Sequence, residues 1–170
     1  MGADERDGAV SESRSADVPA GGGDSRRLLE SESRIEVVTD VFRAEIDTVG
    51  GDLRRVELLE YPVTSDKPDE PVVLMNDSLP NLFVSQSGFT AKRQRDDDDS
   101  LIDAPNHYSQ YQARADHYRL REGRDQLSVD LVWESSEGVE FIKTYKFTRG
   151  DYLVEVEDTI NNKTDRLWRG

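Results

Sequence analysis

The stretch from Arg34 to Pro62 constrains the fold more than any other part of this 170-residue chain. After a shift at residues 38–41, residues 42–48 alternate strictly between uncharged and charged side chains. A period of two places each set on one face of a β-strand, so we expect Arg43, Glu45 and Asp47 to lie on the polar face. The alternation therefore predicts a half-buried strand.

A glycine turn and a return strand follow. Gly50-Gly51-Asp52 predicts a turn, because glycine adopts positive φ angles without a Cβ clash. The return strand begins at Leu53 and ends at Pro62, because proline lacks an N–H for the sheet. Residues 34–62 therefore predict a two-stranded antiparallel unit to which the other strands of a larger sheet are added.

The rest of the chain repeats this pattern of short strands and turns. Apolar residues occupy every second position from Leu127 to Trp133, and turn residues separate this strand from two more. Strands joined by such short turns pair antiparallel. No segment shows an apolar period of 3.6 residues over three turns, so we predict an all-β chain that folds as an antiparallel β-sandwich. The further strands are expected near residues 72–74, 82–84, 118–120, 139–147 and 152–160.

Residues 1–33 differ from the rest of the chain in composition. They contain no Ile, Phe, Tyr or Trp, and they are rich in Gly, Ser, Asp, Glu and Arg. Such a segment buries too little apolar surface to offset the entropy lost on ordering. We predict a disordered linker over residues 1–33 and one folded domain over residues 34–170.

The net charge of −14 limits the partners of this chain. Nucleic acids are bound by cations that neutralise phosphates, so the acidity argues against a nucleic-acid partner. It argues equally against binding to anionic lipid headgroups through overall charge. The chain has no cysteine, which excludes disulfides and thiolate chemistry. It also has no run of about 20 apolar residues of the kind that spans a membrane.

Several short strings occur in an order that is typical of one protein family. No single string is specific, but together they span residues 34–162, and their order and spacing resemble the periplasmic domain of the bacterial YidC-type membrane protein insertase. The strings are Thr48 to Asp52 (T.GGD), Tyr61-Pro62 (YP), Gln86 to Gly88 (QSG) and Phe141 through Asn162 (F.KTY.F.RGDY.V.V...I.N).

The resemblance implies a large twisted sandwich related to the galactose mutarotase fold, on the periplasmic side of the bacterial inner membrane. It implies assistance to the insertion and folding of inner-membrane proteins, alone or with the Sec translocon, so nascent membrane proteins and translocon components would be the partners. The family carries its insertion machinery in membrane helices, so this chain resembles only an extramembrane part. We also expect the sandwich to be truncated at its C-terminus, with part of the facing sheet downstream of Gly170.

A carbohydrate-binding or aldose-epimerase-like β-sandwich is the alternative. Epimerisation needs a general acid and a general base beside the sugar ring, and histidine is the usual acid. His107 and His117 are the candidates, with Asp116 as a nearby carboxylate. Adjacent residues in a strand face opposite sides, however, so Asp116 does not orient His117 through sequence proximity alone.

Two further groups of residues could bind a ligand. Three tyrosines and two glutamines could line a groove, because aromatic faces stack on sugars and pack against peptide side chains, although ordinary sheet packing explains them as well. The run from Asp96 to Asp99 raises the possibility of a calcium site. Calcium-binding loops, however, space their acidic ligands and include a glycine for the turn, and this run has neither feature. We therefore predict no catalytic residue, no cofactor and no metal site, and a domain that acts by docking through a sheet edge or a groove. The groove candidates are Tyr108, Gln110, Tyr111, Gln112 and Tyr118.

Overall fold

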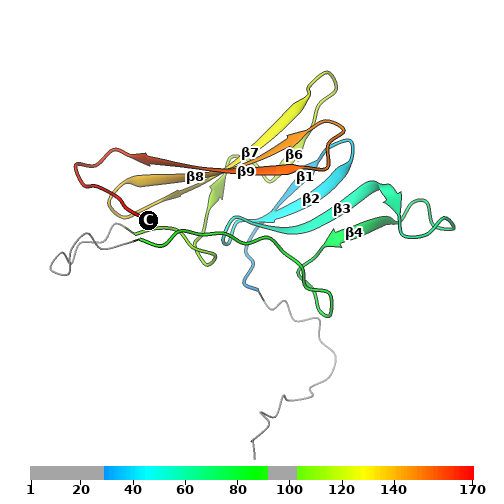
Figure 1. The fold of residues 1–170 in the computed structure, drawn as a ribbon, viewed down its shortest axis with the longest axis horizontal. Coiled ribbons are helices and arrows are strands. Elements are labelled where there is room, and N and C mark those ends of the chain that lie inside the picture. Colours follow the sequence, from blue (N-terminus) through cyan, green and yellow to red (C-terminus); the bar gives the residue numbers. More distant parts are fainter. Residues whose placement is uncertain (1–28, 92–102) are drawn as a thin grey trace, which may run out of the picture.

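The computed structural model describes residues 29–91 and 103–170 and shows two β-sheets packed face to face (Figure 1). These residues contain no helix, which confirms the predicted all-β class, and thus no helix long and apolar enough to cross a membrane. One sheet has the strand order β4-β3-β2-β1-β6 and the other β5-β7-β8-β9. The strands are β1 (Arg34–Val38), β2 (Phe42–Asp47), β3 (Asp52–Pro62), β4 (Pro71–Met75), β5 (Gln112–Ala113), β6 (His117–Arg119), β7 (Gln126–Glu134), β8 (Val139–Thr148) and β9 (Val154–Asn162).

The predicted antiparallel unit is present, but it has three strands instead of the two expected. β2 and β3 pair antiparallel across the turn at Gly50-Gly51, whose φ angles are 75° and 60°. β1 and β2 also pair antiparallel, so the shift at residues 38–41 is itself a turn. In this turn the backbone N–H of Phe42 donates to Oγ1 of Thr39 at 2.9 Å. Residues 34–62 therefore form three consecutive antiparallel strands.

Strands β7, β8 and β9 form the predicted antiparallel meander. Burial alternates at every position of β8, as a strand with one face on the core requires. Tyr152, expected inside the last strand, instead precedes β9. The strand expected at residues 82–84 is an extended segment held by isolated bridges, one of which joins Leu53 and Ser85.

One strand pair departs from the antiparallel pattern. β6 lies parallel to β1, with His117 opposite Glu36. A parallel partner cannot be reached by a tight turn, and β6 arrives only after the chain has contributed β5 to the second sheet. Every other pairing between the named strands is antiparallel, so the predicted antiparallel sandwich is confirmed with this exception.

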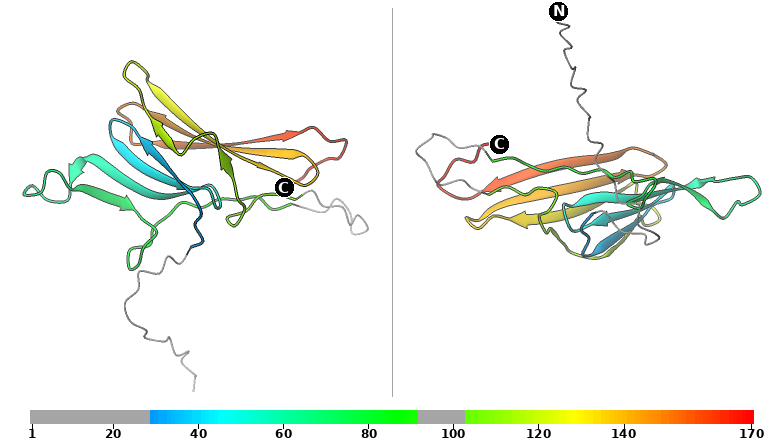
Figure 2. Two further views of the ribbon diagram at one scale, coloured as in Figure 1. Left: turned by 180° about the vertical axis from the view of Figure 1, so that it is seen from behind. Right: turned by 90° about the horizontal axis from the view of Figure 1, so that it is seen from below.

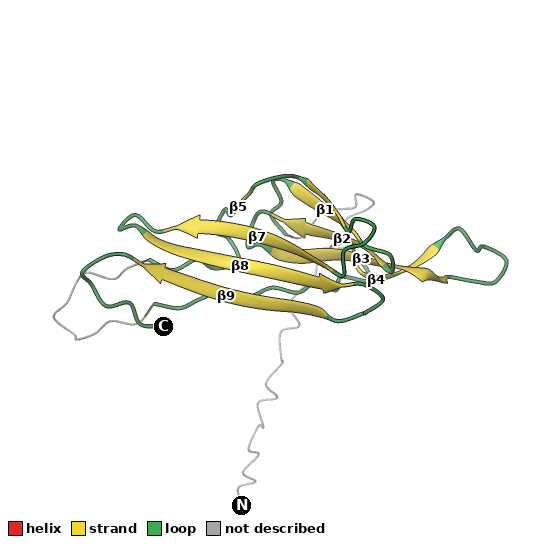
Figure 3. Cartoon of the chain, turned by 90° about the horizontal axis from the view of Figure 1, so that it is seen from above, coloured by secondary structure: helices red, strands yellow, loops and turns green. Residues whose placement is uncertain are grey.

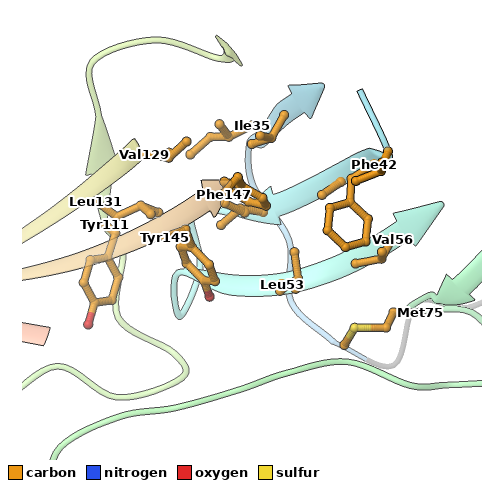
Figure 4. Close-up of a cluster of buried hydrophobic side chains, with 14 residues drawn as sticks. Ile35, Phe42, Leu53, Val56, Met75, Tyr111, Val129, Leu131, Tyr145 and Phe147 are labelled. Atoms are coloured by element: carbon orange, nitrogen blue, oxygen red, sulfur yellow. The ribbon is translucent and has the colours of Figure 1, made fainter. Parts of the chain in front are cut away.

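The core lies between the two sheets (Figure 4). The first sheet contributes side chains such as Ile35 and Leu53, and the second contributes Val129 and Phe147. Burial of a large apolar side chain stabilises the folded state by roughly 1.5–3 kcal/mol, so these rows hold the sheets together. The core residues are Ile35, Val37, Val41, Phe42, Ala44, Ile46, Leu53, Val56, Met75, Tyr111, Val129, Leu131, Tyr145 and Phe147.

The sheets overlap over only part of their lengths. The sheet of β7, β8 and β9 extends past the first sheet on the side of the C-terminus, and β3 and β4 extend past the second sheet on the opposite side (Figures 1 and 2). Figure 3 shows the same offset from above. Phe141, at the C-terminal side, is covered by Phe89 and Trp168, with ring centroids 5.4 Å from each. The opposite end is open.

The prediction for Asp47 was wrong. This side chain was expected on the polar face, but it is fully buried. Its carboxylate remains buried because Arg34 Nε lies 2.9 Å from Oδ2 and the backbone N–H of Val49 donates to Oδ1 at 2.8 Å. A buried carboxylate is tolerated only with such partners.

Several predictions lie beyond what the structure describes. The acidic run from Asp96 to Asp99 and the first 28 residues of the proposed linker are outside the described residues. The linker boundary at residue 33, the extension of the sandwich past Gly170 and the relation to the galactose mutarotase fold also remain predictions.

Candidate functional site

Three strings that are separate in the sequence meet at one buried point between the sheets, which we call the polar junction. Lys143 Nζ, from β8, donates to the carbonyl oxygen of Gly50 at 2.8 Å and lies 3.4 Å from that of Ser87. Tyr145 donates its phenolic O–H to the carbonyl oxygen of Gly51 at 2.7 Å. The junction thus binds the β2–β3 turn and the segment around Ser87 to the second sheet.

Lys143 is almost fully enclosed, with 1% of its surface exposed. Its Nζ also lies 5.1 Å from the centroid of the Tyr111 ring, within range of a cation–π contact. Burial lowers the pKa of the Lys143 ammonium, and the carboxylates of Asp52 and Asp158 partly oppose that shift. Asp158 lies directly opposite Lys143 in the β8–β9 pair. The buried ammonium is therefore held by carbonyl groups and two nearby carboxylates.

Asp52 is the buried acidic member of the junction. Gln86 Nε2 donates to its Oδ2 at 2.7 Å, and Arg54 Nη2 donates to the same oxygen at 2.9 Å. Burial raises the pKa of the Asp52 carboxyl, while the hydrogen bond from Gln86 and the charges of Arg54 and Lys143 oppose the rise. The carboxylate connects β3 to the segment around Gln86.

Arg54 reaches Asp52 because of a β-bulge. Ile46 pairs with Leu53 but Glu45 pairs with Arg55, so Arg54 is the extra residue on β3. The bulge turns this arginine into the protein, where only 1% of its surface is exposed. The irregular spacing from Leu53 to Val56 is the signal in the sequence for this bulge.

The contacts of Lys143 in the polar junction join the two sheets. A nucleophilic or basic lysine needs a free amine with access to a substrate. Lys143 instead donates its hydrogen bonds to backbone carbonyl groups, including those of Gly50 and Ser87. We therefore assign it the role of joining the two sheets.

The open end of the sandwich contains an apolar groove of about 450 Å³. Three aromatic rings meet there: Tyr152 contacts Phe42 edge to face at a centroid distance of 5.4 Å and Tyr61 at 5.5 Å. Tyr61 and Tyr152 belong to two further strings of the resemblance, YP and RGDY. The groove is lined by Phe42, Leu53, Val56, Leu58, Tyr61, Leu74, Met75, Ser85, Tyr152 and Val154.

Tyr152 is held at the rim of the groove by a carboxylate. Its phenolic O–H donates to Glu60 Oε2 at 2.8 Å. Partial burial, together with this hydrogen bond and the Glu60 charge, raises the pKa of Tyr152 to about 12. The hydroxyl therefore stays protonated at neutral pH and fixes the ring over the groove.

The histidines are not brought together by the fold. The His117 ring is exposed, and its Nδ1 lies 3.3 Å from Glu36 while its Nε2 lies 4.0 Å from Asp116. The His107 ring contacts that of its neighbour Tyr108 at a centroid distance of 3.9 Å, with the ring planes tilted by 46°. The described contacts thus join each histidine to its own neighbours and not to the other histidine.

The predicted tyrosine groove is divided among different environments. Tyr111 lies in the core, while Tyr108 is exposed. Gln110, Tyr111 and Gln112 border one hollow, and Tyr118 borders a different one. Gln110 Nε2 donates to Oγ1 of Thr48 at 2.8 Å, so this side chain supports the β2–β3 turn. The five residues do not form a single groove.

Comparison with known proteins gives one consistent result. A family model described as the YidC periplasmic domain matches residues 34–170. Three relatives, each named membrane protein insertase YidC, are similar to this chain. The protein of Methylococcus capsulatus is 46% identical over 141 residues, which are 83% of this chain and 24% of the relative. That of Thioalkalivibrio sulfidiphilus is 43% identical over 137 residues, 81% of this chain and 24% of the relative. That of Nitrosomonas europaea is 38% identical over 158 residues, which are 89% of this chain and 24% of the relative. The chain thus spans about a quarter of the length of these relatives.

Proposed function

Because this chain belongs to the YidC periplasmic domain family, we propose that it is the extracytoplasmic, non-catalytic docking domain of a membrane protein insertase. It lies on the periplasmic side of the inner membrane and assists proteins that enter that membrane. It does so alone or beside the Sec translocon. Nascent inner-membrane proteins and translocon components are accordingly its partners.

One contrast within the molecule supports docking over catalysis. The buried ionisable side chains Asp52 and Lys143 are engaged in joining the two sheets. The groove at the open end is instead lined largely by apolar and aromatic side chains, and Tyr61 and Leu74 are about half exposed there. Exposed apolar surfaces with a polar rim are typical of sites that bind other proteins.

We assign this groove to an apolar segment of a client polypeptide. The relatives are named membrane protein insertases, and a protein destined for the membrane carries long apolar segments. Leu74 and Tyr61 border the groove from β4 and β3, so an apolar side chain can enter between the two sheets. The groove would shield such a segment from water before the segment is inserted into the membrane.

Photo-cross-linking tests this assignment. A benzoylphenylalanine at Leu74, inside the groove, should cross-link a peptide whose leucine- and alanine-rich segment is flanked by lysines. The same group at Leu167 is the control, because this residue is also exposed but does not line the groove. Equal cross-linking at both positions, or cross-linking only to a second copy of the chain, would contradict the docking site.

A deletion tests the supporting role of the domain. Removal of Ile35 to Asn162 from a full-length insertase that carries it should leave insertion largely working, since the polar junction and groove contain no reactive set. Complete loss of insertion, with the shortened protein stably present in the membrane, would show that the domain is essential to the reaction.

The sugar-epimerase alternative has a direct assay. Polarimetry of glucose or galactose with this protein should show no mutarotation above the buffer rate. A rate that disappears on substitution of His107 or His117 by alanine would favour the alternative.

A further inference from the structure

We propose that a cationic hollow at the β6–β7 loop binds the phosphate groups of anionic phospholipids and orients the domain on a bilayer. The hollow has a volume of about 540 Å³ and has no aspartate or glutamate in its lining. Its cations are Arg119, Arg121 and Arg124. The proposal rests on the proposed function, because it needs a domain held close to a membrane. The lining residues are His117, Tyr118, Arg119, Leu120, Arg121, Arg124, Gln126 and Leu127.

Several cations elsewhere on the surface are paired with carboxylates. Arg43 pairs with Glu57 at 3.1 Å, Lys67 pairs with Glu70 at 2.9 Å, and Lys146 pairs with Glu157. Among the described residues, no ion pair forms at Arg119, Arg121 or Arg124. On a chain of net charge −14, three arginines that line one hollow thus have no ion-pair partner within residues 29–91 and 103–170.

The loop that carries the arginines is held in a defined shape. Arg149, at the β8–β9 turn, donates from Nη2 to the carbonyl oxygen of Arg121 at 2.9 Å and from Nε to that of Arg124 at 3.0 Å. Gly123 allows the turn between them with a φ angle of 73°. Because Arg149 binds the backbone of the loop, the side chains of Arg121 and Arg124 remain available for a ligand.

The position and chemistry of the hollow fit a lipid surface. The loop between β6 and β7 projects from the upper end of the molecule, where a planar surface can reach it (Figure 1). Guanidinium groups bind phosphate oxygens through paired hydrogen bonds, and the half-buried Tyr118 and Leu127 add apolar contact beside them. Salt screens charges beyond about 10 Å, so the acidic remainder of the chain opposes such a local contact only weakly.

Vesicle flotation tests the proposal with the intact 170-residue chain. At about 0.1 M salt, where the screening length is about 10 Å, the protein should float with vesicles of phosphatidylglycerol and phosphatidylcholine but not with phosphatidylcholine alone. Each arginine near an anionic surface changes partitioning about five-fold, so substitution of Arg119, Arg121 and Arg124 by alanine should lower it about 100-fold. About 1 M NaCl, where the screening length is about 3 Å, should abolish flotation.

A matched variant separates local from overall charge. Substitution of Arg114, Lys163 and Arg169 by alanine removes the same charge from exposed residues outside the hollow, and partitioning should fall much less. Circular dichroism should show both variants folded. Equal loss in the two variants would overturn the proposal.

Two other anionic ligands, glycerol phosphate and polyglutamate, test whether the hollow binds something other than a lipid surface. Calorimetric binding of glycerol phosphate without vesicle flotation would identify a soluble phosphate as the ligand and overturn the lipid assignment. Binding of polyglutamate without vesicle flotation would identify an acidic peptide and overturn it as well. Failure of flotation with retained cross-linking at Leu74 would reject this inference alone and leave the proposed docking function intact.

Discussion

Lys143 Nζ lies 2.8 Å from the carbonyl oxygen of Gly50, a residue 93 positions earlier in the chain. This hydrogen bond joins the second sheet to the β2–β3 turn of the first. Two of the strings that carry the family resemblance, GGD and KTY, are therefore in direct contact, each from a different sheet. The same holds at the open end, where Tyr61 of YP meets Tyr152 of RGDY.

Replacement of Lys143 by methionine should destabilise the protein by about 3 kcal/mol, because the carbonyl oxygens of Gly50 and Ser87 lose their buried donor. Urea unfolding followed by tryptophan fluorescence measures the loss. Lys146→Met on the same strand is the control and should change stability little, since this lysine is on the exposed face. Equal effects of the two substitutions would show that the polar junction does not stabilise the sandwich.

Gly50→Ala should cost more than Gly123→Ala, although both glycines have nearly the same positive φ angle. The left-handed conformation costs an alanine about 1 kcal/mol at either position. At Gly50 a Cβ would also lie 2.7 Å from the carboxylate oxygens of Asp52, whereas at Gly123 it meets nothing within 4 Å. Thermal unfolding of both variants measures the difference, and similar melting temperatures would contradict a tightly packed turn.

Asp52→Asn should change how stability depends on acidic pH. The folded-state pKa of Asp52 is raised above its ordinary value of 3.8, so the folded protein holds this proton more tightly than the unfolded chain. The native protein should therefore lose stability relative to the variant as pH rises from about 3.8 through the raised pKa, and no further above it. Urea unfolding across this range provides the measurement. A relative gain in stability with rising pH would mean that the ion pair with Arg54 outweighs burial.

Glu60→Gln should lower the pKa of Tyr152 from its value of about 12, because the charge of Glu60 favours the protonated phenol. Carbon-13 NMR of labelled tyrosine rings resolves this residue from the other five tyrosines. The buried Tyr145, whose pKa is also raised, is the internal control and should not move. An unchanged pKa of Tyr152 would show that the hydrogen bond to Glu60 does not hold this ring over the groove.

Local properties of the sequence determined the strands and turns. A period of two needs only neighbouring residues, so the β7–β8–β9 meander was predictable. The turn at Gly50-Gly51 was likewise predictable, because positive φ angles are a property of glycine itself. The family, too, was legible from the order of short strings along the chain.

Only the tertiary structure decided which charged residues are buried. Asp47 lies at a position that the alternation assigns to the polar face, whereas Lys143 is a charged residue on the core face of β8. Each is enclosed because distant partners satisfy its charge. The parallel pairing of β6 with β1 also depends on a long connection rather than on any local pattern. Burial of a charge is favourable only where its partners have been brought together by the fold, and such long-range contacts leave no periodic signal in the sequence.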